Sequence, residues 1–370
     1  MANMKKLKKG EVNPIFILLN DIHIDKSNGE LVKDIFRQVI DIAVQKDISY
    51  IMIGGDVFTN RSGQPLDCLN TFQDILDMTA KKDIIINVIP GNHDKTDADD
   101  ERSYVDVYRG NRLFSVLREG CSRIIGGCPV AFVPYFGDER WKQEFDKARG
   151  ITEEQYQERD VEVDAPAFLI THVAIDGVRN NDGSEVFNDL KPGMFDLYTK
   201  VFVGHYHNAS KIGKNVYYTG SAYQKDFGEN VTDKGCIIVY DDGNFEFVPL
   251  RFPKYIKHTI DVNDSETLRN LIEKYEGEEY DHIRFIIRGK KVDASKIDIN
   301  GIESKGIQCQ FESIEEKEAI DNSVDADALN YDKRSVTKDF IKFCSDNNIK
   351  GAHMKYGLNL IKSLVTLRLS

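Results

Sequence analysis

The sequence predicts an α/β fold built on parallel strands, and two stretches near its start support this. Residues 15–19 and 50–53 are short apolar runs, and apolar residues between 31 and 44 recur at helical spacing. A strand, a helix and a strand in this order form a βαβ unit with parallel pairing and a right-handed crossover. The second run continues as Gly-Gly-Asp56, which is expected where a parallel strand opens into a ligand crevice.

Later segments continue the alternation of strands and helices. Helices are predicted after Pro65 and over residues 138–160. From 216 to 250 the pattern changes to short alternating runs, which we expect to form a second sheet packed on the first. The strands predicted before this change lie at 84–89, 124–135, 167–170 and 200–203, and those after it at 216–218, 236–240 and 245–250.

Composition changes divide the chain into four segments. A boundary near Phe252-Pro253 separates a main domain, residues 1–252, from a small module at 253–311. Residues 312–332 carry eight acidic residues against Lys317, which indicates a solvated linker. Residues 333–370 are basic and predict two helices. In the small module we expect strands at 256–262, 282–288 and 307–311 around a helix at 265–275.

The bulk composition is that of a globular protein of 370 residues, with 41% hydrophobic and 30% charged residues. Apolar runs stay well short of the roughly 18 residues that a membrane helix needs, so no membrane association is expected. Six scattered cysteines without CxxC spacing argue against a disulfide framework or a thiolate zinc site and favour the cytoplasm. The net charge of −12 argues against a polyanion-binding surface as a whole but leaves a local cleft for nucleic acid open.

Metal-ligand types follow successive predicted strands. Carboxylate, amide and imidazole donors suit Mn²⁺, Fe²⁺, Zn²⁺ or Mg²⁺. Seven donors exceed one tetrahedral site but fit two ions that share Asp56, and two such ions can clamp a phosphate and activate a water. In the D-x-H and H-x-H pairs, alternate residues beyond a strand end are expected to face one pocket. The seven donors are Asp21, His23, Asp56, Asn92, His172, His205 and His207.

Each motif alone has a plain structural explanation. Asp21-x-His23 could be a surface loop, Gly-Asn92-His93-Asp94 a turn, and His172 a core histidine with satisfied hydrogen bonds. Their occurrence in order at five strand ends is what favours a metal site.

These motifs resemble the set that marks calcineurin-like metallophosphoesterases, over roughly residues 14–250. The resemblance implies a four-layer αββα sandwich with a binuclear metal site at the sheet edge. By analogy, Asp21, His23, Asp56 and His207 would hold one ion, and Asp56, Asn92, His172 and His205 the other. His93 would then be the proton donor or transition-state stabiliser, with Asp94 fixing its ring orientation.

A second block is similar to SbcD-type DNA nucleases. It comprises residues 220–229, Gly-Ser-Ala-Tyr-Gln-Lys-Asp-Phe-Gly-Glu, and the Lys-Gly-Cys-Ile-Ile-Val run that starts at Lys234. This resemblance implies a small α+β cap at 253–311 that steers DNA, and a C-terminal helical pair that docks on an SbcC-type coiled-coil ABC ATPase. It also implies a homodimer. The apolar residues expected to carry that docking are Phe340, Phe343, Leu360 and Leu364.

The chain departs from the family pattern at Asp25, where a small residue is common, and at Thr59, where an acid is common. Neither position is a ligand, so the expected effect is on the approach of DNA.

Three functions are weighed. The leading one is a Mn²⁺-dependent DNA exonuclease and endonuclease for break processing and recombination, in which a two-metal-activated water hydrolyses backbone phosphodiesters; Mg²⁺, Fe²⁺ or Zn²⁺ remain alternatives to Mn²⁺. The second is a metallophosphatase or phosphodiesterase acting on small molecules or phosphoproteins, which the acidic charge favours. The third is an interaction subunit with structural metals, against which the intact His93 argues.

Overall fold

The computed structural model describes residues 11–158, 160–179, 184–229 and 232–314, together with residues 340, 341, 344 and 354. The described residues divide into two compact units, one within Met1–Ile287 and Asp298–Phe311 and the other within Arg288–Ile297 and Glu312–Ser370. No helix in these described parts is long and apolar enough to cross a membrane. The cytoplasmic location stays a prediction.

The first sheet has six strands in the order β12-β11-β1-β2-β3-β4. β1, β2, β3 and β4 run parallel, whereas β11 pairs antiparallel with β1 and β12 antiparallel with β11. Its strands are β1 (Pro14–Leu19), β2 (Tyr50–Ile53), β3 (Ile85–Val88), β4 (Phe114–Val116), β11 (Gly235–Tyr240) and β12 (Phe245–Pro249).

The second sheet also has six strands, in the order β5-β6-β7-β8-β10-β9. The run β6-β7-β8-β10 is parallel, and β5 and β9 close its two edges antiparallel. Its strands are β5 (Cys121–Ile125), β6 (Cys128–Val133), β7 (Phe168–His172), β8 (Lys200–Gly204), β9 (Ser210–Ile212) and β10 (Val216–Tyr218).

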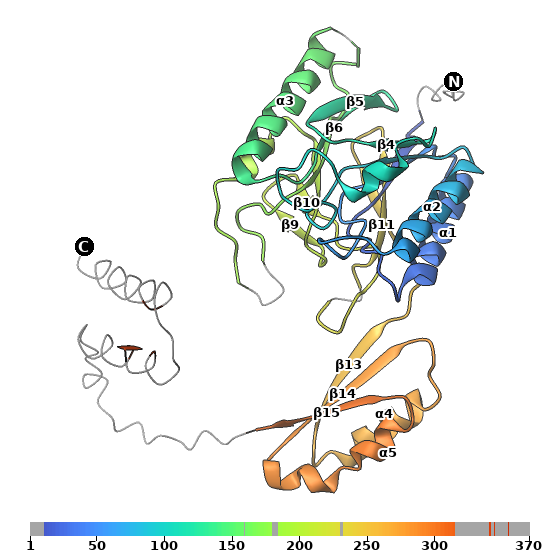
Figure 1. The fold of residues 1–370 in the computed structure, drawn as a ribbon, viewed down its shortest axis with the longest axis vertical. Helices are drawn as coiled ribbons and strands as arrows, with labels where there is room; N and C mark the ends of the chain where they lie inside the picture. Colours follow the sequence, from blue (N-terminus) through green and yellow to red (C-terminus); the bar gives the residue numbers. More distant parts are fainter. Residues whose placement is uncertain are drawn as a thin grey trace. The chain divides into compact units, whose positions relative to one another are not determined.

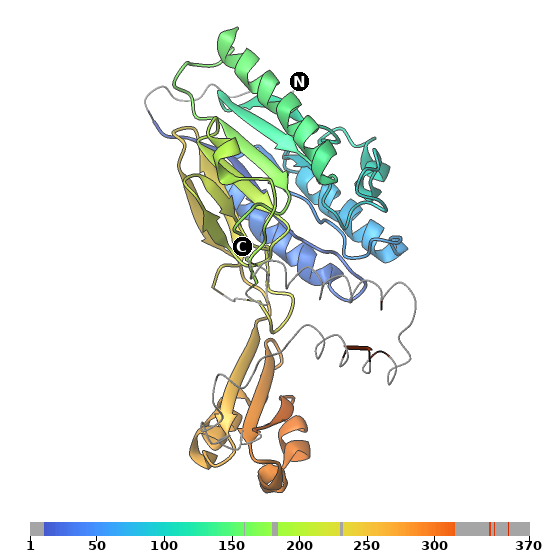
Figure 2. The ribbon, with the colours of Figure 1, turned by 90° about the vertical axis from the view of Figure 1, so that its left-hand side faces the viewer.

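Three separate apolar cores show that helices and sheets form four layers. α1 (Gly29–Lys46) and α2 (Leu66–Ala80) cover the outer face of the first sheet through residues such as Phe36 and Phe72. α3 (Asp138–Gln157) covers the second sheet through Trp141 and Phe145. A third core that includes Phe168 lies between the sheets. Figure 1 shows the strands between α3 and the α1–α2 pair, and in Figure 2 the side that carries α3 faces the viewer.

The α/β fold and its αββα layers are therefore confirmed, but one strand assignment is wrong. The runs at 236–240 and 245–250 do not belong to the second sheet, because β11 joins β1 at the edge of the first. Of the three runs predicted for the second sheet, only 216–218 joins it, as β10, and the sheet begins with β5 and β6. Burial explains the difference, since β11 is buried along nearly its whole length and covers the edge that β1 would otherwise expose.

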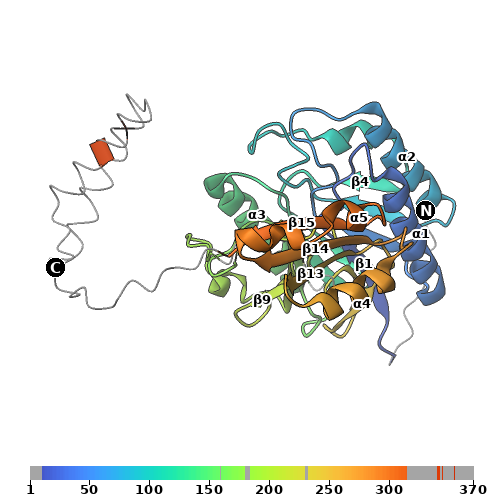
Figure 3. The same cartoon turned by 90° about the horizontal axis from the view of Figure 1, so that it is seen from below.

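A three-stranded sheet follows, in the order β13-β14-β15, and Figure 3 shows it with α4 and α5 beside it. The strands and the helix predicted for the small module are all present, and the predicted domain boundaries stay predictions. The elements are β13 (Tyr255–Asp261), α4 (Ser265–Tyr275), β14 (His282–Gly289), α5 (Ile299–Glu303) and β15 (Gln308–Ser313), and short 3₁₀ turns lie at Tyr104–Tyr108, Pro192–Phe195 and Lys291–Lys296.

The predicted acidic linker at 312–332 and the helical pair at 333–370 fall almost wholly outside the described residues. Of the predicted docking residues, Phe343, Leu360 and Leu364 lie outside them, and Phe340 is a half-buried helical residue.

Candidate metal centre

Five parallel strands from both sheets deliver their carboxyl ends to one place. The segments after β1 and β2 remain paired beyond the strands, with the Asp21 amide bonded to the Gly55 carbonyl at 3.2 Å and the His23 amide to the Asp56 carbonyl at 2.9 Å. The second sheet joins them where His172 Nδ1, at the end of β7, lies 2.9 Å from the Gly54 carbonyl oxygen. The site therefore lies at the shared carboxyl edge of the two sheets.

Two glycines make this approach possible. Gly55 has a φ of +103°, and a Cβ there would lie 2.2 Å from His172 Nδ1. A Cβ on Gly91 would lie 2.4 Å from the backbone nitrogen of Asp56. Both contacts are far below van der Waals separation, so any side chain at these positions would push the strand ends apart.

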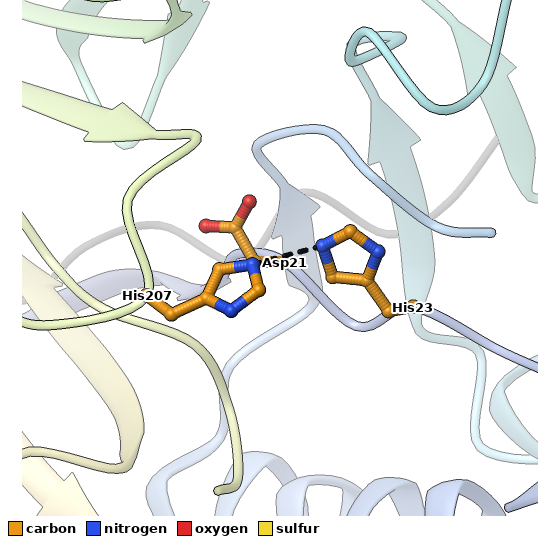
Figure 4. A group of neighbouring side chains, drawn as sticks. All are labelled: Asp21, His23 and His207. Carbon is orange, nitrogen blue, oxygen red and sulfur yellow. Dashed lines mark hydrogen bonds between the residues drawn. The ribbon is translucent and has the colours of Figure 1, made fainter. Parts of the chain in front are cut away.

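The first donor group consists of Asp21, His23 and His207, whose ligand atoms all lie within 4.8 Å of one another. Figure 4 shows the two rings facing each other beside the carboxylate, and their Nε2 atoms are 3.0 Å apart. The Asp21 carboxylate accepts the backbone N–H of His205 at 3.0 and 3.1 Å. This bond ties the end of β1 to the end of β8.

The second donor group consists of Asp56, His172 and His205, again within 4.8 Å of one another. The Asn92 Oδ1 atom lies 2.9 Å from His172 Nε2 and 2.9 Å from His205 Nδ1. Asp56 Oδ2 is 3.4 Å from His172 Nε2 and 3.5 Å from His23 Nε2. One carboxylate thus stands between the two groups, and the structure brings all seven predicted donors together.

Backbone conformation at the site differs from the expected alternation beyond a strand end. Asp21, His23, Asp56 and His205 all have positive φ, between 51° and 92°. These four are among only six such non-glycine residues in the described chain. Their donors converge through left-handed turns and not through an extended backbone, and strained backbone of this kind concentrates at functional sites.

His93 lies beside His23 and Asp56 and is partly exposed. Its backbone N–H donates to Asp56 Oδ1 at 2.8 Å, its Nδ1 lies 2.5 Å from the Thr59 carbonyl oxygen, and its Nε2 lies 3.3 Å from Arg61 Nη2. Because a carbonyl only accepts and a guanidinium only donates, the ring is neutral with its proton on Nδ1.

The predicted role of Asp94 in orienting His93 is wrong, because the Thr59 carbonyl holds that ring. The buried Asp94 carboxylate instead accepts three backbone N–H groups, from Gly91 at 2.9 Å, Phe58 at 3.1 Å and Val57 at 3.2 Å. It ties together the loops after β2 and β3. A carboxylate can accept from several donors at once, and here the nearest donors are amides.

The family model for calcineurin-like phosphoesterases matches residues 15–209. The chain belongs to this family. Two viral proteins are also similar to the phosphoesterase. One, named "Putative phosphoesterase 078R" from Invertebrate iridescent virus 3, is 23% identical over 267 residues, which are 70% of this chain and 72% of the relative. The other, "Putative phosphoesterase 244L" from Invertebrate iridescent virus 6, is 20% identical over 255 residues, which are 68% of this chain and 84% of the relative.

A solved structure of a protein of unknown function from Aquifex aeolicus aligns at 14% identity with a TM-score of 0.23, over 50% of this chain and 94% of its own. That score is too low to bear on the fold. Family membership makes the chain a metal-dependent phosphoesterase, and its histidine and aspartate cluster is compatible with divalent cations.

Burial prepares two of the site histidines of the phosphoesterase as ligands. Burial lowers the pKa of His23 well below its usual value. Burial, together with the charge of His172, lowers the pKa of His205 to about 3. Burial also acts on His172, but the Asp56 carboxylate outweighs it and raises the pKa of His172 to about 9. His23 and His205 therefore present unprotonated nitrogens, the form that binds a cation.

The chemistry of the donors also fits a pair of divalent ions. Two carboxylates, one amide oxygen and four imidazoles converge, with Asp56 central to both groups, and no thiol is among them. Such a set suits ions of intermediate hardness. The assignment of Asp21, His23, Asp56 and His207 to one ion, and of Asp56, Asn92, His172 and His205 to the other, stays a prediction.

Sequence reasoning missed several residues that support this set. Arg61 faces His93, and the Thr59 and Gly54 carbonyls hold the rings of His93 and His172. Glu229 lies 2.7 Å from His207 Nδ1. No spacing rule places these residues at the site. Only the block at 220–229, which contains Glu229, was singled out from the sequence, and no role was predicted for that residue.

Proposed function

We propose that this phosphoesterase is a Mn²⁺-dependent DNA nuclease of the SbcD type that works with an SbcC-type ABC ATPase in break processing and recombination. The observation that carries the proposal is the SbcD-like block at 220–229 and from Lys234. In the fold this block lies at the site, where Glu229 contacts His207 and Ser221 contacts Glu229 at 3.3 Å. A resemblance that includes residues touching the donors bears on activity more directly than one at a distant surface.

The module after the block supports the same proposal. The chain leaves the main sandwich after β12 and forms the β13-β14-β15 sheet with α4, in the order of modules that the SbcD resemblance implies. The proposed cap role, the C-terminal ATPase docking and a homodimer rest on that resemblance.

The chain's own residues suggest how the reaction is assisted. When bound, two divalent ions supply Lewis-acid charge to the phosphate and an activated water. His93 Nδ1 donates its hydrogen bond to the Thr59 carbonyl, so Nε2 is the atom that can face the leaving 3′ oxygen, and it can protonate that oxygen after the ring has taken up a second proton from solvent. Arg61, beside that nitrogen, can pair with a phosphate oxygen.

The test offers linear duplex and single-stranded DNA with Mn²⁺ to the full-length protein, with and without an SbcC-type ATPase. We expect cleavage by wild type and its loss in His93→Ala and Asp56→Ala. Asp242→Ala is the matched control, because its carboxylate lies in the turn after β11. Since β11 runs antiparallel to β1, this turn lies at the opposite edge of the sheet. DNA left intact in every condition would reject the nuclease.

A second candidate is a phosphatase or phosphodiesterase for small molecules or phosphoproteins. The net charge of −12 favours it, and the two viral relatives carry the general name phosphoesterase without a nucleic-acid substrate. Turnover of bis-p-nitrophenyl phosphate without any DNA cleavage would select it.

A further inference from the structure

The SbcD-like block contains a buried ion pair that contacts one predicted ligand. Glu229 is 7% exposed and Lys234 is 1% exposed. Glu229 Oε1 lies 2.7 Å from His207 Nδ1, and Glu229 Oε2 lies 3.0 Å from Lys234 Nζ. The same ammonium donates to the backbone carbonyl of His207. His207 is thus held at its ring and at its backbone by two side chains that bond to each other.

This arrangement selects one form of the His207 ring. An ionised carboxylate only accepts hydrogen bonds, so His207 Nδ1 carries the proton that it donates to Glu229. The Nε2 atom then offers its lone pair on the side that faces His23 Nε2, 3.0 Å away. Histidines that bind metal ions commonly donate their other ring N–H to a carboxylate, which fixes the ring and raises its basicity.

The carboxylate itself has little freedom to move. Its Oε2 atom accepts from Ser221 Oγ at 3.3 Å and from the Lys225 backbone N–H at 3.3 Å, in addition to Lys234. The Glu229 carbonyl accepts from Gln224 Nε2 at 2.9 Å, and the same nitrogen donates to the Tyr255 carbonyl of β13 at 3.0 Å. The segment is therefore fixed through both its side chain and its backbone.

His207 differs from the other site histidines in what holds its second nitrogen. His172 Nδ1 meets the Gly54 carbonyl and His93 Nδ1 the Thr59 carbonyl, both neutral acceptors. Burying a Glu–Lys pair carries a desolvation cost that an apolar pair of similar volume avoids. A pair retained at this cost, in contact with a ligand, calls for a function beyond packing.

We propose that Glu229 and Lys234 are positioning residues that set the tautomer and direction of His207 for the ion held with Asp21 and His23. The inference rests on the metal centre of the proposed function and not on DNA as substrate. The proposal predicts an effect on one ion only. In the described residues, the group of Asp56, Asn92, His172 and His205 has no contact with Glu229.

The experiment titrates Mn²⁺ into EDTA-stripped, full-length protein by calorimetry. Wild type is expected to bind two ions. Glu229→Gln should lower the affinity for one ion by about 10–100-fold, the usual effect of losing such a carboxylate. The affinity for the other ion should stay unchanged. Asp226→Asn is the matched control, because this exposed carboxylate in the same block bonds to Gly228 and not to His207.

Glu229→Gln leaves the Lys234 charge buried without its partner, so a double variant guards against misfolding. Glu229→Gln/Lys234→Met removes both charges and keeps an amide oxygen that can accept from His207. We expect it to unfold cooperatively and to lose affinity at one ion by about 10-fold.

Wild-type affinity for both ions in the double variant would overturn the proposal. An equal loss of affinity for both ions would also overturn it, as would loss of cooperative unfolding. Either result would mean that Glu229 and Lys234 stabilise the fold and do not position His207. A wild-type protein that binds two Mn²⁺ ions with the expected asymmetry between variants, yet leaves DNA intact, would reject the nuclease and leave this proposal standing.

Discussion

The Nη2 atom of Arg61 lies 3.3 Å from Nε2 of His93, on the ring nitrogen that Thr59 leaves free. A guanidinium keeps its charge at any working pH and matches the geometry of phosphate oxygens. A phosphate that enters the site can therefore replace His93 as the hydrogen-bond partner of Arg61. Its arrival would free Nε2 to take up a proton, which the ring could then pass to the leaving oxygen.

Arg61→Ala should consequently lower kcat/KM for bis-p-nitrophenyl phosphate by roughly 10–100-fold, the cost of losing one hydrogen bond to a charged group. Arg61→Lys should recover part of this loss, and Mn²⁺ affinity should not change in either variant. Arg112→Ala is the control, because Arg112 is exposed and precedes β4, at the opposite end of that parallel strand from the site. Steady-state kinetics that show equal activity for Arg61→Ala and Arg112→Ala would refute the assignment.

Gly55→Ala should disrupt the site more than its size suggests. The added methyl would lie 2.2 Å from His172 Nδ1, and a φ of +103° disfavours any side chain. We expect a loss of about 2 kcal/mol or more in the free energy of unfolding, and loss of the ion held with His172. Urea unfolding and Mn²⁺ calorimetry check this, with Gly110→Ala as the control because its Cβ would meet nothing within 4 Å. Normal Mn²⁺ stoichiometry in Gly55→Ala would contradict the expectation.

Local patterns in the sequence predicted much of the first half of the fold. The apolar stripe between 31 and 44 coincides with the buried face of α1, because helical spacing alone decides which side chains face a sheet. The site donors were predictable for a similar reason, since the carboxyl ends of parallel strands meet at one edge. This prediction required only the order along the chain in which strands and the polar residues after them occur.

Contacts that no local pattern encodes were missed. β11 pairs with β1 across more than 200 residues, as in Ile17 with Ile238, and an alternating run does not say which sheet it joins. β4 and β9 have three residues each, too few to show a period. Most partners of His93 and Asp94 lie in the turn after β2, where Asp56, which is not a glycine, follows Gly55 with a positive φ, and the sequence gave no sign of that conformation.

Asp94→Asn tests the structural role found for this carboxylate. An asparagine offers one acceptor oxygen where Gly91, Val57 and Phe58 direct three N–H groups, and its NH₂ group would face at least one of them. We expect a loss of about 1–3 kcal/mol in the free energy of unfolding in EDTA, measured with urea. Asp261→Asn, whose side chain receives the Asn263 N–H in an exposed turn, should change little. Equal stability of the two variants would show that the loops do not depend on Asp94.

The stability of the protein should also depend on pH through Lys95. Its ammonium donates to the Tyr135 carbonyl at 2.7 Å and lies 3.7 Å from the centre of the Phe136 ring. Burial, with the charge of Arg140, lowers the pKa of Lys95 to about 8, whereas in the unfolded chain it is near 10.4. Between these values the unfolded state binds more protons, so the free energy of unfolding gains from Lys95 as pH rises from about 8 toward 10.

Lys95→Met removes this dependence, because methionine does not titrate. We expect the wild type to gain about 2 kcal/mol relative to Lys95→Met between pH 7.5 and 10, measured as the change with pH in the difference between their urea unfolding free energies. Taking the difference cancels the tyrosine and cysteine titrations that both proteins share. For Lys214→Met, at an exposed position, the free energy of unfolding should change with pH as it does in wild type over the same interval. A constant difference between wild type and Lys95→Met would mean that Lys95 keeps its ordinary pKa, with the contacts to Tyr135 and Phe136 compensating fully for burial of the charge.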